Sequence, residues 1–182
     1  MFELEYELSK KDYIEYDLFT LMASSTMKKL LFIQRYIISL IFLVAPFVGR
    51  KISTISFEIW LIVFIIIYLV WVIFYPKFFE AMLKIRLERM INRGKQEYLF
   101  GNHKILIRPE GVFENNKTGI YESHWTAIKK IVETKEKIYI YREAIGVIII
   151  PKRFFFSLNY KEEFIKLVEK YSELERISIE YQ

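Results

Sequence analysis

The side chains that most often carry chemistry are scarce in this chain. Among its 182 residues there is no cysteine, and the two histidines are His103 and His124. Without thiolates, and with no second histidine nearby, a metal site would have to be built from carboxylates. His103 lies in the run Gly-Asn-His, which predicts a turn, and His124 precedes Trp125 near the end of an expected strand. We interpret both histidines as structural or surface residues and Trp125 as a core aromatic.

No recognisable catalytic motif takes their place. The six glycines are scattered, so there is no glycine-rich phosphate loop, and neither Gly-x-Ser-x-Gly nor His-Glu-x-x-His occurs. We therefore predict no catalytic, cofactor-binding or metal-binding residues. The sequence favours a role other than catalysis without deciding whether the protein is an enzyme.

Basic residues gather in two places. The net charge is +5, and residues 77–96 hold six cations and two acids directly after the most apolar run. A basic cluster in that position indicates a membrane edge rather than a nucleic-acid surface. The second place is the pair Lys152 and Arg153, which interrupts the apolar stretch "GVIIIPKRFFFS" just after its proline. The candidate contacts to acidic lipid or to a partner are Lys84, Arg86, Arg89, Arg93, Lys152 and Arg153.

An alternative interpretation applies to the second pair. Lys152 and Arg153 reach a bilayer only if their loop faces it. Otherwise Pro151 ends a strand, Phe154 to Phe156 return to the core, and the two cations are solvated, paired with Glu162 or Glu163. Nearby, alternating acids and bases predict cross-strand pairs on a solvated face: Glu133, Glu136 and Glu143 with Lys135, Lys137 and Arg142.

Residues 59–75 are apolar enough to cross a membrane. They are 17 consecutive uncharged residues, with Trp60, Trp71 and Tyr75 near their ends, where aromatic side chains favour the interface. At about 1.5 Å per residue they extend roughly 26 Å, close to the hydrocarbon thickness of ~30 Å. The soluble alternative is a buried strand or core helix, but such long strands are rare and core helices are seldom apolar all round.

Residues 30–49 form a second, less uniform apolar segment that contains Gln34 and Arg35. An arginine at the centre of a span costs about 2.5–3.5 kcal/mol. Arg35 lies near the start, so its side chain can reach the headgroups at lower cost. We expect a second span here, and the alternative is a helix that lies in the interface.

The short link between these segments predicts a helical hairpin. Lys28, Lys29 and Arg35 flank the first span and six cations follow the second, whereas the link holds Arg50 and Lys51. Because cytoplasmic flanks carry the excess of Lys and Arg, we expect both termini in the cytoplasm.

The N-terminal segment predicts a strand and a helix. "FELEYEL", residues 2–8, alternates with period two, which is typical of a half-buried strand. Ser9 and Asp12 have the spacing of a helix cap, and the helix should reach about Met22. A strand with one apolar face needs a sheet to cover it, so we expect residues 2–8 to fold together with the C-terminal domain.

The chain after the hairpin predicts an α+β domain. Residues 77–96 continue the second span as an amphipathic helix that Gly94 ends, lying either in the interface or on the following domain. Six short strands with turn signals follow up to Pro151. A helix capped by Asn159 and Glu162 comes next, and "RISIEY" could add a last strand.

Three patches of the chain resemble the YcxB-like family of bacterial membrane proteins. They are the N-terminal "FELEYELSKKDYIEYDLF", the hydrophobic hairpin, and the C-terminal "GVF…WTAIKKIVETKEKIYIY…IIIPKRFF" with its Trp, IxxI spacing and Ile-Pro-Lys-Arg-Phe. The resemblance implies a pleckstrin-homology-like (PH-like) domain, which is a curved antiparallel sheet with a closing helix, and a location in the bacterial inner membrane. It implies no assigned activity and offers no catalytic residues to carry over.

These observations together predict an α+β membrane protein. The expected parts are residues 1–28 (strand and helix), 29–76 (two-span hairpin), 77–96 (basic helix) and 97–182 (YcxB-like, PH-like cytoplasmic domain). We expect it to present an interaction or regulatory module to a protein partner or acidic lipid, with no nucleic acid involved. One alternative is an enzyme or transport component with a site between hairpin and domain. Another is a structural homo-oligomer in which Gln34 and Arg35 pair across subunits.

Overall fold

The structure of the protein, a computed structural model, describes residues 1–49, 56–94, 99–143 and 146–179. It divides into two compact units, one made of Met1–Tyr16 with Asn92–Gln182 and the other of Asp17–Ile91. The expected link with Arg50 and Lys51 lies outside the described residues. The fold class is confirmed as α+β, with apolar helices and antiparallel sheets.

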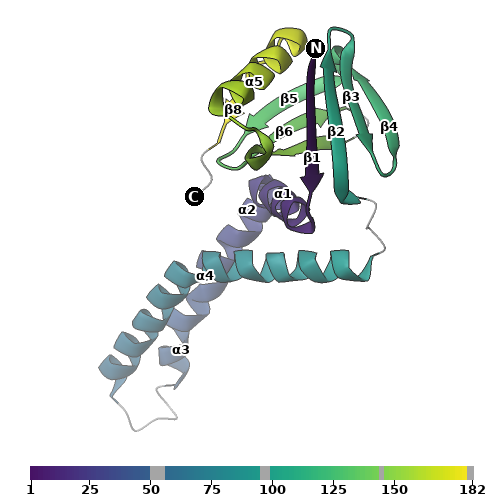
Figure 1. The fold of residues 1–182 in the computed structure, drawn as a ribbon. Coiled ribbons are helices and arrows are strands. Elements are labelled where there is room, and N and C mark those ends of the chain that lie inside the picture. The colour runs from purple at the N-terminus through teal and green to yellow at the C-terminus, as the bar shows by residue number, and fades with distance from the viewer. Residues whose placement is uncertain (50–55, 95–98, 144–145, 180–182) are drawn as a thin grey trace. The chain divides into compact units, whose positions relative to one another are not determined.

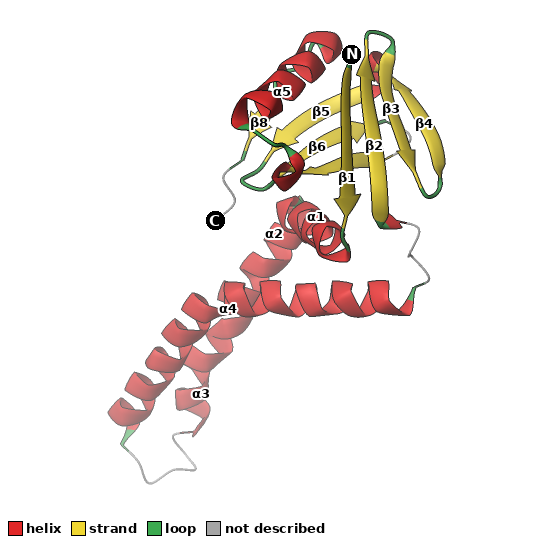
Figure 2. Cartoon of the chain, viewed as in Figure 1, coloured by secondary structure: helices red, strands yellow, loops and turns green. Residues whose placement is uncertain are grey.

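Two four-stranded sheets form the first unit (Figures 1 and 2). One has the order β1-β2-β3-β4, from β1 (Phe2–Leu8), β2 (Gly101–Arg108), β3 (Gly111–Asn116) and β4 (Gly119–His124). The other has the order β7-β6-β5-β8, from β5 (Ile128–Glu133), β6 (Lys137–Arg142), β7 (Gly146–Pro151) and β8 (Ile177–Ser178). All described pairings are antiparallel except that of β8 with β5. Helix α5 (Leu158–Ser172) lies beside the sheets.

Strand β1 belongs to the same sheet as the C-terminal strands. Phe2, Leu4, Tyr6 and Leu8 are buried and the three glutamates between them are exposed, as period-two alternation requires. It pairs with β2 along its whole length, from Phe2 opposite Ile107 to Leu8 opposite Gly101. The prediction that residues 2–8 fold together with the C-terminal domain is therefore confirmed.

The core of this unit is aliphatic and lies between the sheets and α5. Its fully buried side chains are mostly β-branched, which suits packing on pleated strands: Ile105, Ile107, Val112, Ile131, Val132, Ile138, Ile140, Ile148, Ile150, Phe164, Ile165 and Val168. Strand β6 is buried on both faces. Helix α1 (Lys10–Ala23) contacts its outer face, where the rings of Tyr16 and Tyr139 have centroids 5.3 Å apart.

The helix caps follow the expected chemistry with one correction. Ser9 and Asp12 form a reciprocal cap on α1: the Asp12 N–H donates to Ser9 Oγ (3.2 Å) and the Ser9 N–H to Asp12 Oδ2 (3.0 Å). The expected cap of α5 at Asn159 is wrong. Ser157 caps this helix, because its Oγ accepts the N–H of Tyr160 (3.2 Å), and Asn159 already lies within the first turn.

Two other expectations are also wrong. His103 does not lie in a turn but is buried in β2, because the β1–β2 ladder continues to Gly101 and the positive φ of 111° falls at that glycine. Phe156 does not return to the core: it is 80% exposed, since α5 begins immediately after it and only Phe154 and Phe155 are half-buried.

The second unit contains two helical stretches that are long and apolar enough to cross a membrane, Ser25–Val48 and Phe57–Arg93. The first comprises α2 (Ser25–Phe32), the π-helical η1 (Ile33–Ile37), the 3₁₀ turn η2 (Ile38–Leu40) and α3 (Ile41–Gly49). The second is the single helix α4 (Phe57–Arg93). Most of their large apolar side chains are exposed, which a soluble protein rarely tolerates over so large an area.

Helix α4 consists of two straight arms that meet at a sharp bend (Figure 1). Pro76 lies inside the helix. A proline has no N–H, and its ring clashes with the carbonyl of the residue four positions earlier, so it accounts for the bend. Pro76 also stands at the change in composition, since the apolar run ends at Tyr75 and the cations begin at Lys77.

The carbonyl freed by Pro76 receives a hydrogen bond from the other helix. It belongs to Val72, and Arg35 Nε donates to it at 2.8 Å. Beside it the Tyr75 hydroxyl donates to Gln34 Oε1. Gln34 and Arg35 thus both have partners within the same chain, so neither requires a second subunit for this purpose.

Candidate functional site

Four polar side chains on the inward faces of the strands in the first unit form one cluster. His103 shares its face of β2 with Ile105 and Ile107, and the burial pattern of that strand shows the alternation. The other three, Tyr6 on β1, Glu114 on β3 and Arg142 on β6, are likewise buried. Polar groups in this position need partners, because burying an unpaired charge is strongly unfavourable.

Glu114 is the centre of this polar cluster. Its Oε2 accepts from Arg142 Nη2 at 2.9 Å, and its Oε1 lies 3.1 Å from His103 Nδ1 and accepts from Asn116 Nδ2 at 3.3 Å. Burial alone would raise the pKa of Glu114, but the hydrogen bond from His103 and the positive charge of Arg142 outweigh it, so the pKa is lowered. The carboxyl group is therefore ionised, and His103 Nδ1 acts as the donor.

Tyr6 lies directly against this cluster. It is opposite His103 in the β1–β2 register, and the two rings stack with centroids 5.4 Å apart. Burial raises the pKa of Tyr6 well above its ordinary value, and the negative charge of Glu114 adds to the effect. Its phenol thus stays protonated. Among the described residues, the hydroxyl has no hydrogen-bond partner.

A pocket of about 240 Å³ opens beside the cluster. One wall is polar and includes His103, Glu114 and Arg142. The lining also includes aliphatic side chains, and as a whole it comprises Leu8, Tyr13, Leu99, His103, Glu114, Asn116, Thr118, Tyr121, Arg142, Val147 and Ile149. At the mouth, Thr118 Oγ1 accepts from the Tyr121 hydroxyl (2.9 Å) and donates to Asn116 Oδ1 (2.5 Å). A lining that combines charged, hydroxyl and apolar side chains suits a small ligand.

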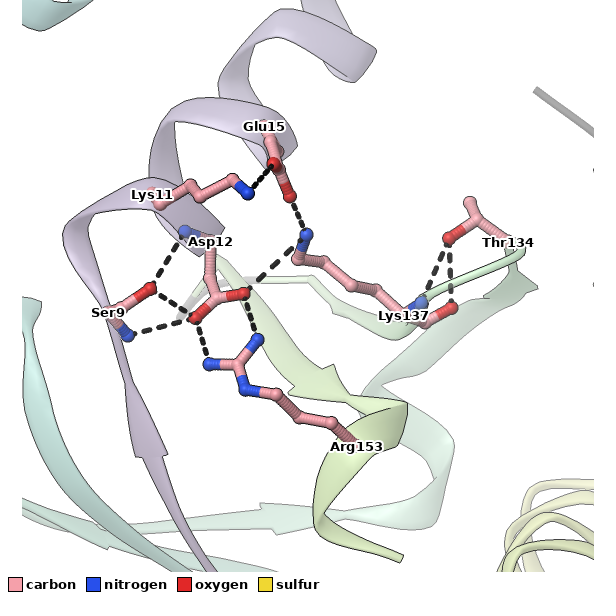
Figure 3. A network of polar contacts seen from close by, with 7 residues as sticks. All are labelled: Ser9, Lys11, Asp12, Glu15, Thr134, Lys137 and Arg153. Atoms are coloured by element: carbon pink, nitrogen blue, oxygen red, sulfur yellow. Dashed lines mark hydrogen bonds and ion pairs between the residues drawn. The ribbon is translucent and has the colours of Figure 1, made fainter. Parts of the chain in front are cut away.

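A second polar network joins α1 to the other sheet (Figure 3). Asp12 accepts two hydrogen bonds from Arg153, Nη1 to Oδ1 at 2.7 Å and Nη2 to Oδ2 at 2.6 Å. Lys137 Nζ lies 3.6 Å from Asp12 Oδ1 and is also paired with Glu15. Asp12 and Lys137 are almost completely buried, so each charge depends on its partners.

The ionisation of Asp12 follows from these contacts. Burial by itself would raise the pKa of Asp12, but the hydrogen bonds from Arg153 and Ser9 lower it far below its usual range. Every contact in the network is intramolecular. We interpret the network as structural: it holds α1 against β6 and the turn η5 (Lys152–Phe154). We do not interpret it as a reaction site.

Glu133 is the centre of a third network. It pairs with Lys152 (2.5 Å), Lys161 (2.7 Å) and Arg176 (2.9 Å) and so connects β5, η5, α5 and the segment before β8. Glu162 pairs with Lys161 and Arg176, each at 2.9 Å, and hydrogen bonds from these two cations lower the pKa of Glu162 to about 2.

The six predicted contact residues fall into two groups. Lys84, Arg86, Arg89 and Arg93 are exposed on the second arm of α4, and none forms an ion pair with another described residue. Lys152 and Arg153 instead pair with acids of their own unit. These are Glu133 and Asp12, so the predicted partners Glu162 and Glu163 are wrong.

The prediction that the alternating charges pair on a solvated face is also wrong for three of the six residues. Glu133, Lys137 and Arg142 are buried in ion pairs with residues far away in sequence. The reason is that α1 covers the outer face of β6, whereas Arg142 lies on the inner face with Ile138 and Ile140. Glu143 does form an exposed pair, with Lys129 at 2.9 Å.

Sequence reasoning missed the cluster of Tyr6, His103, Glu114 and Arg142. The available signal was strand alternation, which places each of these residues on the same face as buried aliphatic neighbours. Within the described ranges, no three His, Asp or Glu side chains gather closely enough to hold a metal ion.

The comparisons with known proteins support a family resemblance for part of the chain. A model of the YcxB-like protein family matches residues 107–168, from the end of β2 into α5, which confirms the resemblance over that segment. No curated protein matches the chain. A solved structure of the Spt16D Pob3N heterodimer overlaps with 44% of this chain and 47% of its own, at 14% identity and a TM-score of 0.36. The matched part is thus less than half of that chain, and nothing about function follows from it.

Proposed function

We propose that the protein is a two-span membrane protein of the bacterial inner membrane that presents a cytoplasmic binding module. The module is the first unit, whose two sheets and α5 are the components expected of a PH-like barrel. Its partners would be acidic lipid at the membrane surface, a protein, or both. The family resemblance and the two apolar stretches support this proposal.

The observation that carries the proposal is the bend of α4 at the boundary between apolar and basic sequence. The arm before Pro76 has the length and composition of a span. The arm after it cannot continue through hydrocarbon, because it carries Lys77, Lys84, Arg86, Arg89 and Arg93. A change of direction at this point allows the second arm to follow the membrane surface.

The second arm has the two kinds of exposed side chain that an interfacial helix needs. Phe79, Leu83, Leu87 and Ile91 form a stripe that is buried within the protein. The remaining surface combines the cations with exposed apolar residues, namely Phe78, Met82, Ile85 and Met90. Apolar side chains enter the acyl boundary, and cations attract anionic headgroups.

Two alternatives have less support. An enzyme or transport component would need a reactive site, and the polar clusters described above have mutually satisfied charges rather than a nucleophile with a base. A structural homo-oligomer was suggested because Gln34 and Arg35 could pair across subunits. Both have partners within the chain, so that reason no longer applies. Neither alternative is needed to explain the fold.

Topology reporters fused to each end of the chain will test the proposed orientation. We expect both the N-terminal and the C-terminal fusion to report the cytoplasm, because basic flanks precede the first span and follow the second. A fusion inserted in the link between the spans should report the opposite side and serves as the control. Periplasmic activity at either terminus would exclude the two-span hairpin or its orientation.

The interfacial arm can be tested through a single introduced thiol, since the chain has no cysteine. An environment-sensitive dye at Ile85→Cys should shift to the blue in vesicles containing phosphatidylglycerol. The shift should diminish when the four cations of the arm (Lys84, Arg86, Arg89 and Arg93) are replaced by alanine, since each is worth about 1 kcal/mol at low salt. The matched control replaces four exposed lysines of the first unit, Lys117, Lys135, Lys166 and Lys170, and should keep the full shift. Equal spectra for the two quadruple variants would contradict the proposal that the second arm of α4 lies on the membrane surface.

A further inference from the structure

We propose that Arg35 binds the phosphate group of a phospholipid in the leaflet that adjoins the basic ends of the two spans. This inference rests on the proposed membrane location of the second unit and goes beyond it, because it assigns a ligand-binding residue. Arg35 belongs to the π-helical turn η1, and its contact on α4 lies in the same unit. The residue is distinct from the cations on the second arm of α4.

The guanidinium of Arg35 is held in place through one of its three nitrogens. Arg35 Nε donates to the Val72 carbonyl at 2.8 Å, and the guanidinium carbon lies 4.9 Å from the centroid of the Tyr36 ring. Neither terminal nitrogen forms a hydrogen bond or an ion pair with any residue of the described ranges. A guanidinium has five N–H donors, so the four on the terminal nitrogens are available to a ligand.

The charge of Arg35 is likewise without a carboxylate partner in the described part of the chain. Arg35 is half-buried. In water, solvent would supply acceptors for the remaining N–H groups. At the edge of the hydrocarbon layer, unpaired N–H groups and an unpaired charge are both unfavourable. A phosphodiester supplies a negative charge and two free oxygens, which match the planar fork of the terminal nitrogens.

The position of Arg35 along the helices brings such a phosphate within its reach. On α4, the bonded residue Val72 precedes the end of the apolar run at Tyr75 by three residues, which is about 4.5 Å of helix. On the first stretch, Arg35 follows the exposed Lys29 by six residues, which is about 9 Å. Arginine side chains near the end of a span extend toward the headgroups. The terminal nitrogens can therefore meet the phosphate layer while Nε stays on the Val72 carbonyl.

The backbone around Arg35 is an independent observation that favours a functional role. Ile33–Ile37 is a π-helical turn, and the N–H of Ile38 donates to the carbonyl of Ile33, five residues earlier. Such turns are rare and occur frequently at functional sites. Within this turn the adjacent residues Gln34 and Arg35 both contact α4. The unusual backbone conformation thus coincides with the residue that we propose as the ligand contact.

Native mass spectrometry of the full-length protein, released from detergent micelles, will test the class of ligand. The probes are phosphatidylglycerol, phosphatidylethanolamine and diacylglycerol with the same acyl chains, and inorganic phosphate is added as a competitor. We expect both phospholipids to remain bound about tenfold more than diacylglycerol, which lacks the phosphate. Inorganic phosphate should displace neither. Equal retention of diacylglycerol, or displacement of both phospholipids by inorganic phosphate, would overturn the proposal.

Arg35→Gln tests the residue itself. It removes the charge and the terminal fork, so the retention of phosphatidylglycerol should fall about tenfold. The matched control is Gln34→Leu, which removes the neighbouring hydrogen bond from Tyr75 and should leave retention unchanged. A second control replaces the exposed Lys28 and Lys29 by alanine and should reduce retention less than Arg35→Gln does. A loss in either control as large as that in Arg35→Gln would refute a specific contact at Arg35.

Arg35→Lys covers the case in which Arg35→Gln does not fold. It keeps the positive charge and a donor but loses the planar fork, so it should also retain less phosphatidylglycerol than the wild type. Unchanged retention in Arg35→Lys would contradict bidentate recognition. The topology reporters decide the membrane location separately. With the two-span hairpin established by them, failure of the lipid tests would overturn this inference alone.

Discussion

Replacing Asp12 with alanine is expected to lower the unfolding free energy of the first unit by about 3 kcal/mol, the lower end of the range for breaking a buried ion pair. The substitution removes both hydrogen bonds from Arg153 and the one from the Ser9 N–H. It also leaves Lys137 buried with Glu15 as its remaining described carboxylate. We place the value low in the range because Arg153 is half exposed and can be rehydrated.

The measurement can use Trp125 fluorescence during denaturant unfolding, in a background of Trp60→Phe and Trp71→Phe. Trp125 is then the one tryptophan left, and it is buried in the first unit. Lys11→Ala is the matched control on the same helix, since Lys11 is exposed and its pair with Glu15 is long at 3.8 Å. It should change the stability by less than about 0.5 kcal/mol. Indistinguishable unfolding curves for the two variants would refute a stabilising role for Asp12.

The same prediction has a pH dependence with a definite sign. The pKa of Asp12 is lowered in the folded state, so its ionised form stabilises the fold at every pH above the unfolded value of about 4. That stabilisation is lost as the pH falls further toward the folded value. The wild type should therefore lose more stability between neutral and acidic pH than Asp12→Ala does.

Deleting residues 1–8 is expected to unfold the first unit altogether. The deletion removes the whole of β1 and exposes the edge of β2 with which it pairs. It also removes the buried side chains Phe2, Leu4, Tyr6 and Leu8. At about 1.5–3 kcal/mol for each buried apolar side chain, the loss is comparable with the whole stability of an ordinary domain.

The opposite face of the same strand provides the control for this deletion. Glu3, Glu5 and Glu7 are exposed, and replacing all three by serine removes only the surface pairs of Lys104 with Glu3 and Glu5. Exposed pairs of this kind contribute little to stability, so this variant should stay folded. Limited proteolysis and Trp125 fluorescence distinguish the two results. A truncated protein with an unchanged melting temperature would show that β1 is dispensable.

The sequence predicts the fold well where one local pattern decides the outcome. Alternation in "FELEYEL" predicts β1, and the cap formed by Ser9 and Asp12 is found as expected. The strands up to Pro151 and the end of α4 before Gly94 follow from apolar periodicity and turn residues. In each case hydrophobic pattern and backbone preference agree, so tertiary context had little to change.

The polar interior was not predicted, because it depends on long-range pairing. Lys137 and Arg142 lie at the two ends of β6, and a short strand with charged ends is usually solvated there. Here α1 covers one face and the other sheet covers the opposite face, so both cations are buried. Their partners lie on α1 and β3, and no local pattern in the sequence predicts which distant elements will pack together.

The bond from Arg35 to the Val72 carbonyl bears on how the hairpin enters the membrane. In the proposed two-span arrangement, the first helix alone would have to extend the Arg35 guanidinium to the headgroups, at some cost, instead of to a backbone acceptor. The second alone would expose the backbone carbonyl that Pro76 leaves without an intrahelical donor. Each helix alone is therefore less stable in lipid than the two together. The first supplies the hydrogen-bond donor, and the second supplies the acceptor. Integration of the first helix should therefore wait until ribosomal synthesis has delivered Val72, after which the pair partitions into the bilayer in one step.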